Sequence, residues 1–123
     1  MSRDLASLSA SDLVRLTSTL EVSPVEVVQA ALDRIELYNP ALNAVVTLNE
    51  AALDDARVLE AELIGGAAPG RLCGVPVGIK DVTPVAGLRT TYGSPLYADN
   101  VPDEDALVVE RLRAAGAIII GKT

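Results

Sequence analysis

The sequence predicts an α/β protein, because helical and strand patterns alternate along it. Residues 23–38 combine a helix-start signal with apolar residues at helical spacing, and residues 104–115 form a second clear helical pattern. The apolar run "AIII" at 117–120 is typical of a strand buried on both faces of a parallel sheet. The complete order is helix, strand, helix, strand-rich loop, helix and strand, which is an α/β order.

Composition limits the classes of protein to consider. The 123 residues are enough for one domain with one modest core, and an apolar share of 50% excludes a disordered tail. A net charge of −7 argues against nucleic acid and anionic lipid as partners. No apolar run is long enough to cross a bilayer, and the N-terminus lacks the apolar core of a secretory signal. We therefore expect neither a nucleic-acid partner nor a membrane partner.

Two residue counts restrict the chemistry. Cys73 is the single cysteine, so no disulfide can form within the chain and a cytoplasmic location is expected. The absence of histidine excludes a Ser-His-Asp triad, a Cys-His dyad and a His-bound metal supplied by this chain. Any proton carrier must then be Lys, Asp, Glu, Tyr or Cys, and we expect no cofactor and no metal.

The first half of the chain reads as mainly helical. Ser9, followed by Asp12, predicts the start of a short helix, and "SPVE" at 23–26 predicts the start of a longer one. The second helix is expected to stop near Tyr38, because Asn39 precedes Pro40 and is disfavoured in the α region. Residues 44–48 read as a short strand.

The middle of the chain combines one more helix with irregular segments. Residues 49–63 predict a helix capped by Asn49, and the glycine-rich residues 65–70 predict a flexible break. Residues 74–81 are strand-like although they contain two glycines and a proline. Residues 85–103 form a long irregular stretch of the kind that often carries function.

The last helix and strand raise a question of nucleotide binding. Acidic residues begin the helix over 104–115, two arginines lie in its last turn, and Gly116 is the expected residue after its end. "GAIIIGKT" at 116–123 also satisfies the phosphate-loop pattern GxxxxGKT. A phosphate loop, however, runs from a strand into a helix, whereas Gly116 here closes a helix and three β-branched residues follow. A nucleotide-binding module is therefore a remote alternative.

The segments from 72 to 123 together resemble the amidase signature family. "GVPVGIKD" at 74–81 is similar to the family segment that carries a catalytic lysine, here Lys80, and "TTYGS" and "RLRAAGAIIIGKT" follow in the family's order. The resemblance implies helices packed on a mixed β-sheet and a small-molecule amide as substrate. It also implies that residues 1–123 are the N-terminal segment of a single amidase domain, helical over 1–65 and with a lysine-bearing α/β part over 71–123.

The resemblance gives Lys80 the role of a base. The implied mechanism is a Ser-Ser-Lys relay, in which the lysine takes a proton from the attacking serine through a second serine held on a cis peptide bond. A lysine can act in this way only while it is neutral, and a salt bridge would keep it charged. Because neighbouring side chains in a strand face opposite ways, Asp81 need not pair with Lys80.

The family's two serines have no counterpart in the sequence. No "GGSSGG"-like segment occurs, and neither Ser23 nor Ser94 matches the family's serine motifs. We therefore expect this chain alone to be inactive. It would be a truncated gene product, an expressed fragment or part of a split enzyme, able to associate with itself or with the rest of the fold. The alternative is a non-catalytic fragment or subunit, such as part of the A subunit of a tRNA-dependent amidotransferase.

Other polar and reactive residues have simpler explanations. Cys73 is expected to be a small buried apolar side chain, and Tyr92 and Tyr97 are expected to pack on the irregular loop. An acidic group lacks the ligand spacing of a calcium loop and fits a helix start better; it comprises Asp99, Asp103, Glu104 and Asp105.

Overall fold

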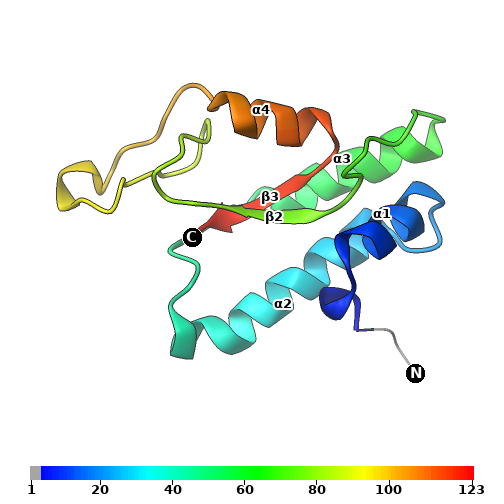
Figure 1. Cartoon of the computed structure of the whole chain (residues 1–123), viewed down its shortest axis with the longest axis horizontal. Helices are drawn as coiled ribbons and strands as arrows, with labels where there is room; N and C mark the ends of the chain where they lie inside the picture. Colours follow the sequence, from blue (N-terminus) through cyan, green and yellow to red (C-terminus); the bar gives the residue numbers. More distant parts are fainter. Residues whose placement is uncertain (1–3) are drawn as a thin grey trace.

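A computed structural model describes residues 4–123; the first three residues of the predicted helical part lie outside the described residues. The chain forms a three-stranded sheet between two layers of helices (Figure 1). The elements, in chain order, are η1 (Leu5–Ser7), α1 (Ala10–Ser18), α2 (Pro24–Leu42), β1 (Thr47–Leu48), α3 (Ala52–Ile64), β2 (Pro76–Ile79), η2 (Pro95–Tyr97), α4 (Leu107–Ala114) and β3 (Ile118–Lys122). The predicted α/β class is confirmed.

The sheet has the order β1-β3-β2, so β3 is its central strand. It is mixed, because β3 runs parallel to β2 and antiparallel to β1. In this chain β1 and β2 pair with the two edges of β3, and helices cover both of its faces.

The two faces of β3 bury different side chains. Ile118 packs with Val28 of α2 and with Ala52 and Ala56 of α3. Ile119 points to the other face and packs with Ile79 and with Val109 of α4, among other residues. Figure 1 shows the same arrangement, with α4 on one side of the sheet and α2 on the other. Aliphatic side chains therefore build the core, because the sequence contains no Phe and no Trp.

The predicted starts of α1 and α2 are confirmed. The Ser9 side chain accepts a hydrogen bond from the Asp12 amide, and Ser23 and Glu26 form a capping box. The predicted end of α2 near Tyr38 was wrong, because the helix continues through Pro40 to Leu42.

The extension of α2 past Pro40 has a local cause. The Asn39 side chain both donates to and accepts from the Val45 backbone, at 2.9 Å in each case. Asn43 then ends the helix in the left-handed conformation, with its amide donating to the Asn39 carbonyl at 2.7 Å. Hydrogen bonds to residues beyond the helix thus outweigh the local preference of a residue before proline.

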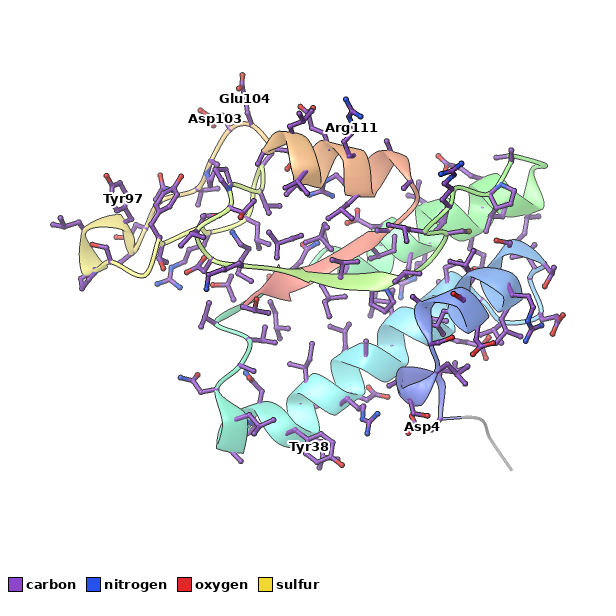
Figure 2. All side chains as sticks on the ribbon, in the orientation of Figure 1. Asp4, Tyr38, Tyr97, Asp103, Glu104 and Arg111 are labelled. Carbon is purple, nitrogen blue, oxygen red and sulfur yellow. The ribbon has the colours of Figure 1, made fainter. Side chains whose placement is uncertain are left out.

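The starts of the two later helices also differ from prediction. Helix α3 begins at Ala52, and Asn49 lies in the turn before it, where its side-chain oxygen accepts from the Ala51 amide at 3.1 Å. The Asn49 side-chain amide donates to Ile119 O at 2.8 Å and so joins this turn to β3. Helix α4 begins at Leu107, after the acidic residues. Asp105 accepts from the Ala86 amide and pairs with Arg113 at 3.0 Å, whereas Asp103 and Glu104 point outward (Figure 2).

Candidate active site

Lys80 lies directly after β2, at the point where the chain leaves the sheet. The backbone on either side of it is bound to Thr123, because Ile79 O accepts from the Thr123 amide at 2.9 Å and the Asp81 amide donates to Thr123 O at 2.8 Å. The Lys80 side chain is exposed. Its backbone is therefore fixed by the sheet while its amine is free to meet other groups.

Asp81 points away from Lys80. Its carboxylate accepts from the Thr91 amide at 3.1 Å and from the Thr91 hydroxyl, and it pairs with the Lys122 amine at 3.7 Å. Within residues 4–123, Lys80 forms no ion pair. The expectation that Asp81 need not pair with Lys80 therefore agrees with the structure.

Lys122 is a buried lysine at the end of the central strand. It has no exposed surface, and its amine donates to Thr83 O and to the Thr90 hydroxyl, both at 2.7 Å. Burial lowers the pKa of Lys122 from its ordinary value of 10.5, while the charge of Asp81 and its hydrogen bonding oppose this shift. The Lys122 amine thus ties Thr83 and Thr90 of the loop over 81–92 to β3.

A bulge in β3 decides which way Lys122 points. Val77 is opposite Ile119, but the next residue, Gly78, is opposite Gly121, so Ile120 is an extra residue in β3. Ile79 is then opposite Lys122. Because side chains alternate along a strand, the bulge puts Lys122 on the same face as Ile119, where the loop over 81–92 lies.

The "GKT" string is part of the sheet. Gly121 lies where a Cβ atom would be 2.5 Å from Thr47 O, so only glycine fits between β1 and β3. Lys122 turns inward, and the Thr123 backbone bonds on both sides of Lys80. The phosphate-loop geometry is not formed over residues 116–123, because this segment is a strand.

Sequence reasoning missed Lys122, which it considered only as part of a phosphate loop. The available signal was a lysine that directly follows a run of buried β-branched residues, since such a charge must find buried partners. The partners themselves, on the loop over 81–92, could not be read from the sequence because they depend on the bulge.

The remaining singled-out residues have structural roles. Cys73 is fully buried, and Tyr92 packs edge-to-face on Tyr97 with ring centres 5.1 Å apart. Ser23 and Ser94 each cap a helix by accepting a backbone hydrogen bond.

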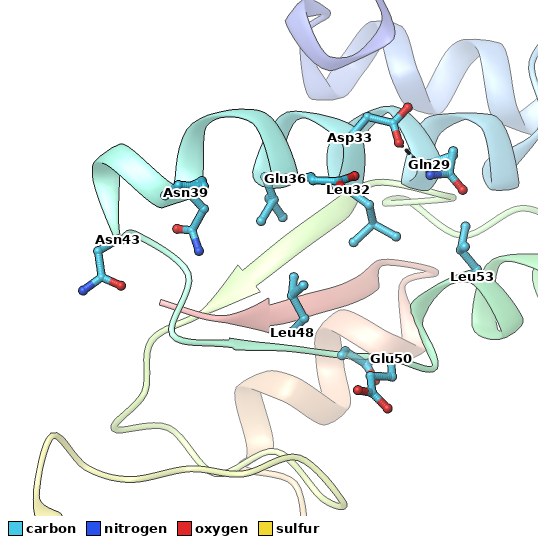
Figure 3. A pocket seen from close by; sticks show the side chains of 12 residues that line it. Gln29, Leu32, Asp33, Glu36, Asn39, Asn43, Leu48, Glu50 and Leu53 are labelled. Atoms are coloured by element: carbon cyan, nitrogen blue, oxygen red, sulfur yellow. Dashed lines mark hydrogen bonds between the residues drawn. The ribbon is translucent and has the colours of Figure 1, made fainter.

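An open hollow of about 650 Å³ lies between α2, β1 and the start of α3. Figure 3 shows Leu32 and Leu53 pointing into it beside Asp33, Glu36 and other polar residues. Lys80 does not line this hollow. The lysine base that the sequence predicts is therefore not part of this hollow. Among residues 4–123, no helix is both long enough and apolar enough to span a membrane.

Comparison with known proteins identifies the class of protein. The Amidase family profile matches residues 26–123, so the chain belongs to the amidase family. Its fold is that of solved amidase signature enzymes. It matches a peptide amidase from Stenotrophomonas maltophilia with a TM-score of 0.90 and 36% identity, over 96% of this chain and 25% of that one. A bacterial aryl acylamidase matches with a TM-score of 0.90 and 28% identity, over 98% and 26%.

The curated relatives include proteins of two kinds. The A subunit of the glutamyl-tRNA(Gln) amidotransferase of Carboxydothermus hydrogenoformans is 43% identical over 121 residues, which cover 98% of this chain and 25% of that protein. The acylamidase of Rhodococcus erythropolis is 40% identical over 117 residues, which cover 94% and 24%. The chain thus spans about a quarter of the length of the curated relatives it matches.

Proposed function

We propose that residues 1–123 are the N-terminal segment of a single amidase domain and supply the lysine base of a Ser-Ser-Lys amide hydrolase. The observation that carries this proposal is the position of Lys80, directly after β2 with its amine exposed and with Asp81 turned to the other face. The nucleophile and the bridging serine are absent from this chain, so the chain alone is inactive.

The chemistry requires a base that is neutral when substrate is bound. The Lys80 amine takes the proton of the attacking serine through the bridging serine, and the serine oxygen then attacks the amide carbon. The same proton returns through the relay to the departing amine, because an amide nitrogen leaves only after protonation. The sheet contributes rigidity, since Thr123 bonds to the backbone on both sides of Lys80.

A chimera tests the role of Lys80. The segment replaces the aligned quarter of the Rhodococcus erythropolis acylamidase, which is 40% identical. Lys80→Ala should lower kcat by about 10³-fold, which is within the usual range for a general base. Lys80→Arg should not restore it, because a guanidinium keeps its proton at working pH. An arginine variant within a few-fold of the unmodified chimera would overturn the proposal.

The second candidate is a non-catalytic fragment or subunit, such as part of an amidotransferase A subunit. It is favoured by the relatives that are amidotransferase A subunits; the one from Azoarcus is 47% identical over 116 residues, against 40% over 117 residues for the acylamidase. Its partners would be companion subunits. Binding of such subunits without any amide hydrolysis would favour this candidate. Hydrolysis of acyl amides without them would favour the first.

The coding sequence after Thr123 separates a catalytic segment from a non-catalytic one. An in-frame segment rich in glycine and serine supports the hydrolase, and its absence supports a fragment that binds a partner. We propose a small-molecule amide as substrate and, on the ground of the single cysteine, a cytoplasmic location. Within the described residues β1 and β2 are the outer strands of the sheet, so the chain would associate with itself or with the rest of the fold through their outer edges.

A further inference from the structure

The ion pair between Lys122 and Asp81 takes no part in the proposed relay, yet it adjoins the proposed base. Lys122 is fully buried and the Asp81 side chain is 12% exposed. A buried pair of this kind gives little net stability over apolar side chains of similar volume, so its presence needs another explanation.

We propose that Lys122 is a positioning residue for Lys80: it holds the Asp81 carboxylate on the inner face of the sheet and so keeps that carboxylate away from the neighbouring base. This inference rests on the proposed function, because it matters only if Lys80 must lose its proton. A free carboxylate beside Lys80 would stabilise the ammonium form and oppose that loss.

The strand register supports the placement of Asp81 and Lys122 on one face of the sheet and of Lys80 on the other. Thr123 continues the parallel ladder to Asp81, so the side-chain alternation of β2 extends past Lys80. Ile79 and Asp81 therefore share one face, and the bulge in β3 puts Lys122 on that same face. Lys80 lies on the other face.

The hydrogen bonds around the pair hold Asp81 in this orientation. One carboxylate oxygen accepts from the Thr91 amide and the other from the Thr91 hydroxyl. The Lys122 amine is in turn fixed by Thr83 O and the Thr90 hydroxyl. The pair is thus attached to the loop at three residues, and none of these bonds is shared with the Lys80 side chain.

Other charged groups near the pair are engaged elsewhere. On the loop, Arg89 donates to Ala98 O and to the Thr47 hydroxyl, and Asp105 pairs with Arg113 of α4. Strand β1, which pairs with β3, contributes only Thr47 and Leu48. The acidic and basic side chains of α4 that remain, Glu110 and Arg111, are exposed. Within residues 4–123, Asp81 is the carboxylate that pairs with Lys122.

The test uses the fact that Lys80 and Lys122 are the only lysines in the sequence. Lysine labelled with ¹³C at Cε gives one NMR signal for each, and both can be titrated in the 123-residue chain. We expect the Lys80 signal of Lys122→Met to titrate about half a pH unit higher than in the unmodified chain, because the positive charge is lost and Asp81 is left unpaired. Asp81→Asn should move the Lys80 titration the other way, and the double variant should return it to the unmodified position.

Two outcomes would overturn the inference. One is a pH midpoint of the Lys80 signal that neither single substitution changes. The other is a midpoint in the double variant that differs from that of the unmodified chain. If Lys122→Met does not fold, Asp81→Asn and the double variant still give the opposite shift and the return. Loss of activity on changing Lys80 tests the proposed function separately, because it does not depend on these titrations.

The same variants in the acylamidase chimera add a functional readout. The pH dependence of kcat/KM for Lys122→Met should move to higher pH and return in the double variant. A general loss of stability would lower the rate at every pH without moving the profile, so the shift distinguishes positioning from simple structural support.

Discussion

The Lys122 amine, at the end of the central strand β3, lies 3.7 Å from the carboxylate of Asp81, which follows the parallel strand β2. This pair explains why a lysine ends a strand of isoleucines, and why the aspartate after Lys80 is not its partner. It also links the segments "GVPVGIKD" and "AIIIGKT", which are 36 residues or more apart in the sequence and adjacent in the fold.

The pH dependence of stability should report the burial of Lys122. Its pKa is lowered in the folded chain, so between that pKa and 10.5 the unfolded chain binds more protons. The free energy of unfolding should therefore rise as pH increases through this window. Lys122→Met should lack that rise. Urea unfolding of both chains at several pH values across the window measures the difference. Plots of the free energy of unfolding against pH that run parallel for the two chains would contradict the prediction.

Nucleotide should not bind to the "GKT" string. Its lysine is buried and its glycine is packed against Thr47, so ATP with magnesium should leave the thermal midpoint where magnesium alone leaves it. A ligand present at a hundredfold over its Kd would add about 2.7 kcal/mol of stability. A clear upward shift of the midpoint by ATP would therefore show that the strand assignment fails in solution.

Much of this fold could be predicted from local patterns, and the failures have a common cause. The capping box at Ser23 and the place of Gly116 just after the end of α4 depend on neighbouring residues, and both were predicted correctly. The end of α2 and the start of α3 depend on hydrogen bonds that Asn39 and Asn49 make outside their helices. Local propensity cannot include such bonds.

The position of Lys80 in the fold could be predicted in the same way. The segment "GVPVGIKD" placed Lys80 at a strand end, and strand alternation separated it from Asp81. The role of Lys122 required the bulge at Ile120, which moves it from one face to the other. No sequence pattern indicates a bulge at that place, so the partners of Lys122 on the loop could not be predicted.

Gly121→Ala should loosen β1 from the sheet. A Cβ atom at this position would lie 2.5 Å from Thr47 O, so the two backbones must separate, at a cost of about 1–3 kcal/mol. Hydrogen exchange at the Val46 and Asn49 amides, which bond to β3 carbonyls, should become faster. Gly65→Ala is the matched control, because Gly65 has an ordinary φ of −73° and should change stability by less than about 0.5 kcal/mol. Unchanged hydrogen exchange at these two amides in Gly121→Ala would contradict the close approach of Gly121 to Thr47 O.

Asn39→Ala should shorten α2. The variant loses both side-chain hydrogen bonds to Val45, which should lower the free energy of unfolding by about 2 kcal/mol. Asn43→Gly is the control, because its φ of 49° suits glycine and should leave stability within about 0.5 kcal/mol. Equal effects from the two substitutions in urea unfolding would show that Asn39 does not hold the last turn.

Chemical rescue tests the role of Lys80 most directly. In the acylamidase chimera, Lys80→Ala should regain amide hydrolysis when ethylamine is added, because the free amine can replace the missing base. The rate should rise with the concentration of neutral amine, and guanidinium should give no rescue because it keeps its proton. The control is the same amine without enzyme. A Lys80→Ala chimera that remains fully active, or one that ethylamine and guanidinium rescue equally, would contradict the account.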